Sequence, residues 1–299
     1  MKLTSHSEYG ELRSVYLKRP REAMQDNERI GRTWKELNFL EAPDFERALV
    51  EYAAFESLLR ISQTEVLYLP VEEDVTMDSM YCRDASLATD FGMILCNMGK
   101  MARKPEPAAC RRAFEAAGSQ ILGAIDGPGT LEGGDVAWLD THTLAVGHTY
   151  RTNAEGIRQL KVLLEPRGIE IVTAQLPHYK GQADVFHLMS IISPVDRDLA
   201  VVYSPLMPIT FREQLLARGF ALIEVPDAEF DTMGCNVLAI GPRKVVMVAG
   251  NPVTRSRLIQ AGCTVYEYDG ADISVKGGGG PTCLTRPLRR AVDEMVTWR

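Results

Sequence analysis

One unit recurs five times along the chain: an apolar strand, a helix rich in Glu, Ala, Leu and Arg, and a second apolar strand. A repeated unit constrains the fold strongly, because each copy must bury its apolar faces against its neighbours. The expected copies span residues 14–70, 92–125, 143–173, 199–226 and 244–268. Their helices are expected at 44–59, 108–117, 154–164, 209–218 and 254–261. Four of these helices are followed by a glycine suited to a helix C-terminus, namely Gly118, Gly168, Gly219 and Gly262.

A further short segment lies between copies and carries one polar residue in a small or apolar context. These segments are 80–87, 129–136, 183–190, 233–238 and 272–286. Their polar residues are Asp84, Glu132, His187, Asn236 and Cys283. Five strand–strand–helix–strand units arranged radially would bring equivalent positions together on one axis. We therefore expect an α/β fold, a fivefold pseudo-symmetric α/β propeller of ββαβ repeats, with residues 1–299 forming one domain. A doubly wound sheet is the alternative, but the sequence has no glycine-rich nucleotide-binding loop.

The bulk composition narrows the partners of the protein. The formal net charge is -7 without blocks of like charge, which argues against nucleic acid and anionic membranes and favours a small cationic ligand. The N-terminal residues lack the apolar segment of a secretory signal, and no apolar run is long enough to cross a bilayer. Six cysteines without a regular spacing indicate reduced thiols and a cytoplasmic location.

A run of four glycines, Gly277 to Gly280, leads through Pro281 and Thr282 to Cys283. Consecutive glycines weaken packing, so a chain keeps them where the backbone must bend sharply or approach another group closely. The run therefore predicts a thiol held in a defined position, and we interpret Cys283 as a nucleophile. A small buried core cysteine is the alternative.

The other polar residues complete a reactive set. His187 can activate the thiol and transfer protons, and Glu132 can orient the imidazole. Asp84 and Glu132 can clamp a planar cation that offers paired N–H donors, such as a guanidinium.

Each residue also has an ordinary structural interpretation. Asp84 could form a surface ion pair with the adjacent Arg83, and Glu132 could belong to a turn. His187 could be a core histidine, and Asn236 could cap backbone groups. A zinc site built from three residues lacks any supporting ligand spacing, and its candidates are Cys82, His187 and Cys283.

The segments Glu132-Gly-Gly-Asp135 and Phe186-His187-Leu188, with the glycine run before Cys283, resemble the guanidino-group modifying enzymes, or penteins. These include arginine deiminases, dimethylarginine dimethylaminohydrolases and amidinotransferases. The resemblance implies a fivefold α/β propeller and a covalent amidino intermediate on Cys283. It also implies that His187 is the acid and base, that Glu132 and Asp84 hold the guanidinium, and that neither metal nor organic cofactor is required.

Dimethylarginine dimethylaminohydrolases look most similar in detail. Asp78 stands six residues before Asp84, as their substrate-binding aspartate does, and Arg103 stands nineteen residues after it. Arg151-Thr152-Asn153 is similar to a segment whose arginine meets the substrate carboxylate. The resemblance thus implies substrate binding by Asp78, Arg103 and Arg151, and we add Asn236 to this group. Solvated surface charge is the alternative for both arginines.

Two positions depart from these relatives. Arg83 stands where dimethylarginine hydrolases usually have Glu, and Met189 stands where relatives have Asp or Lys.

We expect a cysteine hydrolase that acts on the guanidino carbon of an arginine-type substrate, N-substituted arginine included. It would release an amine or ammonia and a ureido product such as citrulline. An amidinotransferase and a non-enzymatic binding protein on the same fold are the alternatives. The expected partner is a small cationic guanidino compound, and the expected state is a monomer or homodimer.

Overall fold

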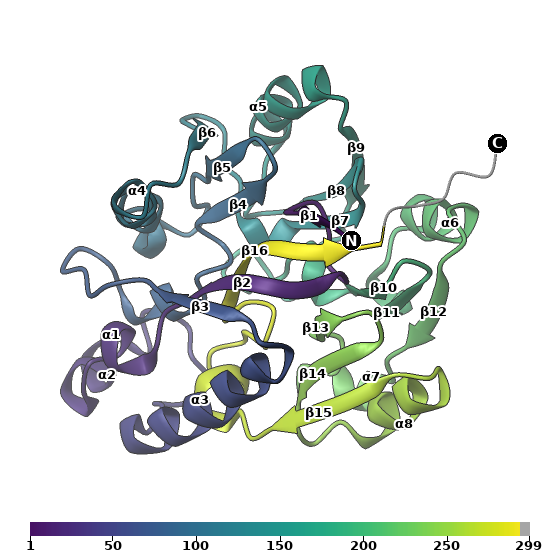
Figure 1. Cartoon of the computed structure of the whole chain (residues 1–299). Helices are drawn as coiled ribbons and strands as arrows, with labels where there is room; N and C mark the ends of the chain where they lie inside the picture. Colours follow the sequence, from purple (N-terminus) through teal and green to yellow (C-terminus); the bar gives the residue numbers. More distant parts are fainter. Residues whose placement is uncertain (294–299) are drawn as a thin grey trace.

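The strands form five small sheets around a central axis (Figure 1), in a computed structural model that describes residues 1–293. The strands are β1 (Lys2–Thr4), β2 (Glu11–Leu17), β3 (Glu65–Tyr68), β4 (Ser86–Thr89), β5 (Gly92–Leu95), β6 (Ile121–Ala124), β7 (Val136–Asp140), β8 (Thr143–His148), β9 (Glu170–Gln175), β10 (Ile192–Asp196), β11 (Leu199–Val202), β12 (Ala221–Glu224), β13 (Leu238–Gly241), β14 (Lys244–Val248), β15 (Thr264–Tyr268) and β16 (Thr285–Val292). The helices are α1 (Pro20–Ala23), α2 (Asn27–Thr33), α3 (Phe45–Leu59), α4 (Glu106–Ala116), α5 (Ala154–Leu164), α6 (Ile209–Ala217), α7 (Asp227–Phe230) and α8 (Pro252–Gln260).

Each sheet follows the same connection. In the sheet β4–β5–β6, β4 pairs antiparallel with β5, and α4 then crosses over so that β6 pairs parallel with β5. The sheets β7–β8–β9, β10–β11–β12 and β13–β14–β15 repeat this order. The helices lie at the periphery of the ring (Figure 1). The predicted ββαβ repeat and the fivefold propeller are therefore confirmed.

The ring closes between the two ends of the chain. β16 pairs antiparallel with β2, Thr285 opposite Leu17, and β2 pairs parallel with β3. β1 adds a further strand along the other edge of β16. In this sheet, the place of the first strand of the repeat is taken by β16, from the C-terminal part of the chain. The pairing of β16 with β2 fixes the position of the segment directly before β16, which carries Cys283.

The core consists of the strands and the inner faces of the helices. All four residues of β11, Leu199 to Val202, are buried, as expected for a strand covered on both faces. Helix α5 buries one stripe, Ile157, Leu160 and Leu164, at helical spacing. The predicted glycines at the helix ends all have a positive φ, at Gly118, Gly168, Gly219 and Gly262.

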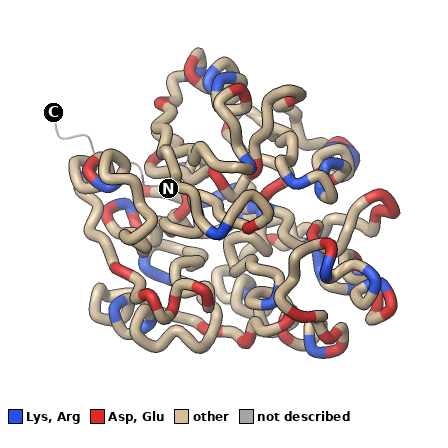
Figure 2. Tube along the Cα trace, turned by 180° about the vertical axis from the view of Figure 1, so that it is seen from behind, with Lys and Arg blue, Asp and Glu red and all other residues tan. Residues whose placement is uncertain are grey.

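Charged residues of both signs are interspersed over the outer helices and loops (Figure 2). Within residues 1–293, no helix combines the length and apolarity needed to cross a membrane. All six cysteines are free and buried.

Candidate active site

The five polar residues singled out in the sequence occupy equivalent places in the ring. Each lies in the turn directly before the first strand of its sheet, and each is buried: Asp84 before β4, Glu132 before β7, His187 before β10, Asn236 before β13 and Cys283 before β16. Because these first strands meet around the axis, the turns converge there. Residues that lie far apart in the sequence therefore share one site.

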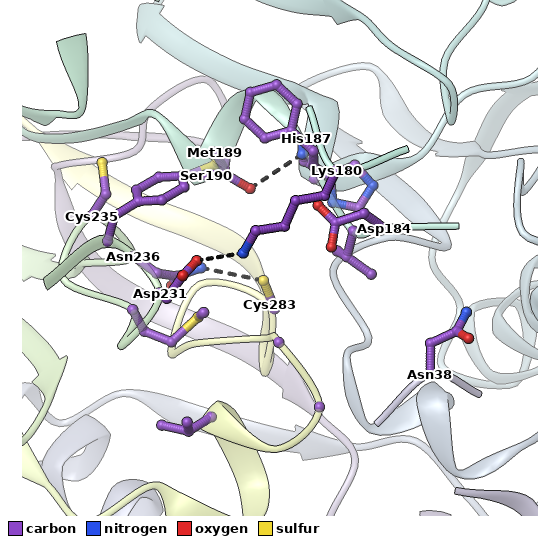
Figure 3. Close-up of a pocket in the computed structure, with 18 of the residues that line it drawn as sticks. Asn38, Lys180, Asp184, His187, Met189, Ser190, Asp231, Cys235, Asn236 and Cys283 are labelled. Carbon is purple, nitrogen blue, oxygen red and sulfur yellow. Dashed lines mark hydrogen bonds and ion pairs between the residues drawn. The ribbon is translucent and has the colours of Figure 1, made fainter. Parts of the chain in front are cut away.

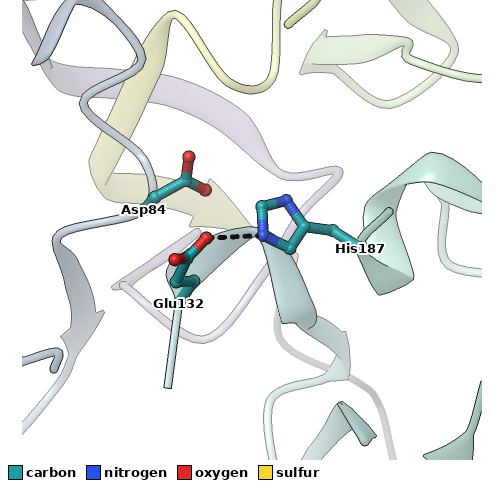
Figure 4. A group of neighbouring side chains, drawn as sticks. All are labelled: Asp84, Glu132 and His187. Atoms are coloured by element: carbon teal, nitrogen blue, oxygen red, sulfur yellow. Dashed lines mark hydrogen bonds and ion pairs between the residues drawn. The ribbon is translucent and has the colours of Figure 1, made fainter. Parts of the chain in front are cut away.

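His187 and Glu132 form a buried pair (Figure 4). His187 Nε2 lies 2.8 Å from Glu132 Oε2, and the side chain of Glu132 has no exposed surface. The other oxygen, Oε1, accepts hydrogen bonds from the backbone N–H groups of Gly99 at 2.9 Å and Lys100 at 3.0 Å. The backbone thus holds Glu132 in place, and Glu132 orients the imidazole through Nε2.

The pair is charged. Burial alone would lower the pKa of His187, but the carboxylates of Asp135, Glu132 and Asp84 raise it well above its usual range. Burial alone would raise the pKa of Glu132, but the hydrogen bond and charge of His187, with Arg151, hold it below its usual range. At neutral pH the site therefore contains an imidazolium, which can donate a proton to a leaving group.

Asp84 presents one bound and one unpartnered oxygen. Oδ2 accepts a hydrogen bond from Arg103 Nη1 at 2.5 Å, whereas buried Oδ1 has no hydrogen-bond partner in the described part of the chain. Gly134 makes this arrangement fit, because a Cβ there would lie 2.5 Å from His187 Nδ1 and 2.8 Å from Asp84 Oδ1. A buried acceptor without a partner is costly, so this oxygen is suited to accept from a ligand N–H.

The ligating atoms of Asp84, Glu132 and His187 lie within 4.8 Å of one another (Figure 4). That spacing would suit a metal ion or a planar organic cation. Glu132 is committed to His187 and Asp84 to Arg103, so one carboxylate oxygen remains to receive a donor. This favours a hydrogen-bonding cation such as a guanidinium over a coordinated metal.

The glycine run wraps around Tyr81. A Cβ at Gly277 would overlap the Tyr81 hydroxyl, and one at Gly279 would lie 2.5 Å from its ring. Gly278 between them adopts φ +71°, a left-handed conformation that favours glycine. A Cβ at Gly280 would lie 2.6 Å from the side-chain amide of Asn236. The run therefore allows the close approach of the backbone that the sequence predicted.

Asn236 holds the thiol. Its Nδ2 donates to Cys283 Sγ at 3.3 Å, and its Oδ1 accepts from Thr282 N at 3.0 Å and Thr282 Oγ1 at 2.8 Å. Burial and the negative charge of Asp84 raise the pKa of the Cys283 thiol, although the hydrogen bond from Asn236 opposes them. The thiol of the free protein is thus neutral near pH 7, and a cation bound beside it would favour the thiolate.

A cavity of about 260 Å³ opens onto Cys283 and His187 (Figure 3). Asn236 and Met189 also line it. Its outer wall carries aromatic side chains and charged residues, namely Tyr179, Phe186, Phe230, Lys180, Asp184 and Asp231. The volume lies just below the range of about 300–1,000 Å³ that is typical of small-molecule sites.

Four expected substrate-binding residues have protein partners and do not line this cavity within residues 1–293, namely Asp78, Asp84, Arg103 and Arg151. Asp78 Oδ2 lies 2.6 Å from Lys100 Nζ. Arg151 Nη1 lies 3.5 Å from each oxygen of Glu132. Arg103, expected to meet a substrate carboxylate, binds Asp84 and makes two 2.8 Å hydrogen bonds to Glu106. The physical reason is burial, because two enclosed carboxylates require a cation.

The ordinary interpretations of the charged residues also change. Arg83 and Asp84 do not pair on the surface, because Arg83 Nη2 binds Glu8 Oε1 at 2.7 Å and Asp84 binds Arg103. Arg103 and Arg151 are each 4% exposed, so neither is a solvated surface charge.

The sequence interpretation missed two buried acids. Glu106 anchors Arg103, and no local sequence feature marks it. Asp135 accepts from Leu188 N at 3.0 Å and Thr149 Oγ1 at 2.7 Å. Asp135 is the last residue of the Glu-Gly-Gly-Asp motif, so a signal for it was present. Its negative charge contributes to the raised pKa of His187.

Comparisons with known proteins agree with this architecture. The family profile described as N,N dimethylarginine dimethylhydrolase, eukaryotic, matches residues 19–290. An uncharacterized protein of Bacillus subtilis, YkgA, is 30% identical over 294 residues, covering 97% of this chain and 96% of its own. The dimethylarginine dimethylaminohydrolase of Pseudomonas aeruginosa is 27% identical, covering 81% of this chain and 89% of its own.

A solved structure of the Pseudomonas enzyme, a cysteine-to-serine variant complexed with citrulline, superposes with a TM-score of 0.75 at 23% identity. It covers 93% of this chain and 99% of that one, so the two proteins share the fold over nearly their whole length. With the profile match across almost all of the sequence, the chain belongs to the dimethylarginine dimethylaminohydrolase family of guanidino-modifying enzymes.

Proposed function

We propose that the protein is a cysteine-dependent hydrolase of a guanidino carbon, with an arginine-type compound as substrate. The observation that carries the proposal is the shared cavity of Cys283 and His187, with the buried Glu132 carboxylate on the imidazole. A scaffold for binding alone has no need of a thiol that shares a cavity with a charged imidazole. The activities named for its relatives support the same reaction class.

The first half of the reaction forms an adduct. The guanidinium enters beside the free oxygen of Asp84. Its positive charge favours the Cys283 thiolate, and the thiol releases its proton to solvent. The sulfur attacks the guanidino carbon, and the C–N bond to the departing amine breaks. His187 supplies the proton that this amine takes up. An amidino group then remains bonded to sulfur.

The second half returns the thiol. Water attacks the amidino carbon, and neutral His187 takes its proton. The C–S bond breaks, which releases a ureido product and the Cys283 thiolate. The thiolate takes up a proton from solvent once the product has left, and the starting thiol is restored. Water and guanidine are thereby converted to a urea and an amine or ammonia. Asn236 donates to the sulfur in the free protein, and the same donor can stabilise the sulfur as it leaves carbon.

The test is incubation with arginine and N-methylated arginines, followed by detection of ureido product and of an amidino mass increase on Cys283. Cys283→Ser should bind substrate with nearly unchanged affinity and retain less than about a hundredth of wild-type kcat. More activity than that would reject the nucleophile. An added primary amine that captures the amidino group in place of water would identify an amidinotransferase, and absence of any adduct would indicate a binding protein.

A further inference from the structure

Three buried arginines lie at the centre of the ring. Arg83 stands in the turn before β4, and Arg286 and Arg290 belong to β16 (Figure 1). Arg83 Nη2 donates to the backbone oxygen of Val136 in β7 at 3.2 Å, and Arg290 Nη1 donates to that of Ala239 in β13 at 2.8 Å. Contacts with the first strands of different sheets place these side chains where the sheets meet. Arg83, Arg286 and Arg290 are 1%, 4% and 1% exposed, so the three charges are enclosed by protein.

One carboxylate accompanies the three cations. Glu8 Oε1 lies 2.7 Å from Arg83 Nη2, whereas no ion pair joins Arg286 or Arg290 to a carboxylate among residues 1–293. Arg286 Nη2 donates instead to the backbone oxygen of Arg83 at 2.7 Å. Burial and the charge of Arg83 lower the pKa of Arg286 and of Arg290 to about 10, against the opposing charge of Glu8. Both remain protonated at neutral pH, and the cluster carries two more positive charges than negative ones.

The same arginines have buried donors to spare. Five of their nitrogen atoms have no hydrogen-bond partner in the described part of the chain, namely Arg83 Nε and Nη1, Arg286 Nε, and Arg290 Nε and Nη2. Buried donors without acceptors are costly, above all on charged groups. Arg103 is equally buried, but each of its side-chain nitrogens has a partner, and it stands between two carboxylates. The central cluster therefore lacks both acceptors and negative charge, and a bound anion would supply the two together.

We propose that Arg83, Arg286 and Arg290, the central arginines, bind a monatomic anion of the halide class, such as chloride. A halide accepts N–H groups from any direction, so it suits donors that come from separate guanidinium groups. A carboxylate or phosphate would bring further atoms into an enclosed region. In the enzymes that the sequence resembles, Glu usually stands at the position of Arg83, so the excess of positive charge is a feature of this chain. The anion stabilises the fold and takes no part in the proposed reaction.

Thermal unfolding in sodium chloride and in sodium gluconate, at an equal ionic strength of about 0.1 M, measures the binding. Gluconate is too large for an enclosed site, so the Tm of the wild-type protein should be higher in chloride, by about 4 °C or more. Arg83→Gln removes one positive charge and should reduce this difference by about half or more. Glu8→Gln keeps an acceptor for Arg83 but removes the negative charge, so the difference should grow. Arg158→Gln is the control, since Arg158 forms an exposed ion pair with Glu155 at 2.7 Å, and it should keep the wild-type difference.

Diffraction locates the ion directly. Wild-type crystals grown in sodium bromide should show one anomalous peak among the guanidinium groups of the central arginines, and Arg83→Gln should lose most of its height. Ordered water at this place, without anomalous signal, would overturn the proposal. A bromide peak combined with equal Tm values in chloride and gluconate would also overturn it, because that result would indicate an adventitious ion only. Neither measurement involves turnover, so the outcome is independent of the proposed function.

Discussion

Arg103 Nη1 lies 2.5 Å from one carboxylate oxygen of Asp84, and the other oxygen of Asp84 has no hydrogen-bond partner among residues 1–293. The same guanidinium is fixed from behind by two hydrogen bonds to Glu106 and one to the backbone oxygen of Tyr81. The contacts therefore run from the buried Glu106 through Arg103 to Asp84, whose second oxygen can still accept a hydrogen bond. We infer from these contacts that Arg103 positions Asp84 and does not itself contact the substrate.

Arg103→Lys tests this role. Lysine keeps the charge between Asp84 and Glu106 but loses the planar fork that joins them, so Asp84 should be less well positioned. We expect kcat/KM to fall about tenfold, by the same factor for arginine and for agmatine. A larger loss for arginine alone would restore the expected contact between Arg103 and a substrate carboxylate.

The free energy of unfolding of Arg103 variants serves as a control for the kinetic test. Arg103→Met should destabilise the fold by about 3–5 kcal/mol, because it leaves two buried carboxylates without a cation. Arg103→Lys should lose much less, as measured by urea unfolding. An Arg103→Met variant as stable as wild type would show that Asp84 and Glu106 do not depend on this charge.

His187→Ala should lose both halves of the reaction, because one imidazole donates to the amine and later accepts from water. The expected decrease in kcat is about 10²–10⁴-fold. Rapid quenching and mass analysis of Cys283 should show slower adduct formation and slower adduct breakdown. His142→Ala, an exposed histidine in the turn between β7 and β8, is the matched control. Adduct formation at wild-type rate in His187→Ala would mean that another group protonates the leaving amine.

The raised pKa of Cys283 predicts how its alkylation depends on pH. Because burial and Asp84 raise the pKa of the thiol, the thiolate fraction is small at pH 7 and grows as the pH rises above the usual range of a thiol. Iodoacetamide, which is neutral, should therefore react slowly at pH 7 and faster with increasing pH. 2-Chloroacetamidine should react faster at pH 7, since its charge favours the thiolate.

Asp84→Asn should separate the two reagents. Removal of the negative charge lowers the pKa of the thiol, so alkylation by iodoacetamide at pH 7 should rise about threefold to tenfold. The same variant loses an acceptor for the cation, so alkylation by 2-chloroacetamidine should fall. Parallel changes with both reagents would show that Asp84 acts on Cys283 alone and does not bind the cation.

The periodic features of the sequence were sufficient to predict the propeller. Alternation of apolar strands with helices gave the repeat, and glycines such as Gly118 marked the helix ends. The order of Asp84, Glu132, His187 and Cys283 gave the candidate site, because a closed ring brings equivalent turns together. These features depend on local pattern and on symmetry, both of which a sequence displays.

The partners of buried charges could not be predicted in the same way. Whether Arg103 contacts a substrate or Glu106 depends on which carboxylates the fold encloses with it. Its two acidic partners, Asp84 and Glu106, lie 19 and 3 residues away along the chain. The same holds for an exposed pair, since Lys180 and Asp231 lie 51 positions apart along the chain. Tyr81, which the glycine run surrounds, carried no signal because aromatic residues are common in cores.

Met189 borders the cavity together with His187 and is 2% exposed. The enzymes that the sequence resembles have Asp or Lys at this position, and an Asp there would offer a charged acceptor to a guanidinium. A thioether accepts only weak hydrogen bonds but packs well against methyl groups. One wall of the site is therefore less polar than it would be with a carboxylate.

This wall predicts a preference among guanidines. Each N–H group of an unsubstituted guanidinium that is left without an acceptor in a buried site costs about 1–3 kcal/mol, whereas an N-methyl group has no such requirement. We expect kcat/KM for N-methylated arginine to exceed that for arginine. Met189→Asp should shift the ratio of the two kcat/KM values toward arginine by about tenfold, and so should Met189→Gln, a neutral acceptor of similar length. Met189→Leu should leave the ratio unchanged, because it preserves volume and polarity. Steady-state kinetics on both substrates measures the ratio, and a wild-type preference for arginine that persists in all three variants would show that Met189 does not influence substrate choice.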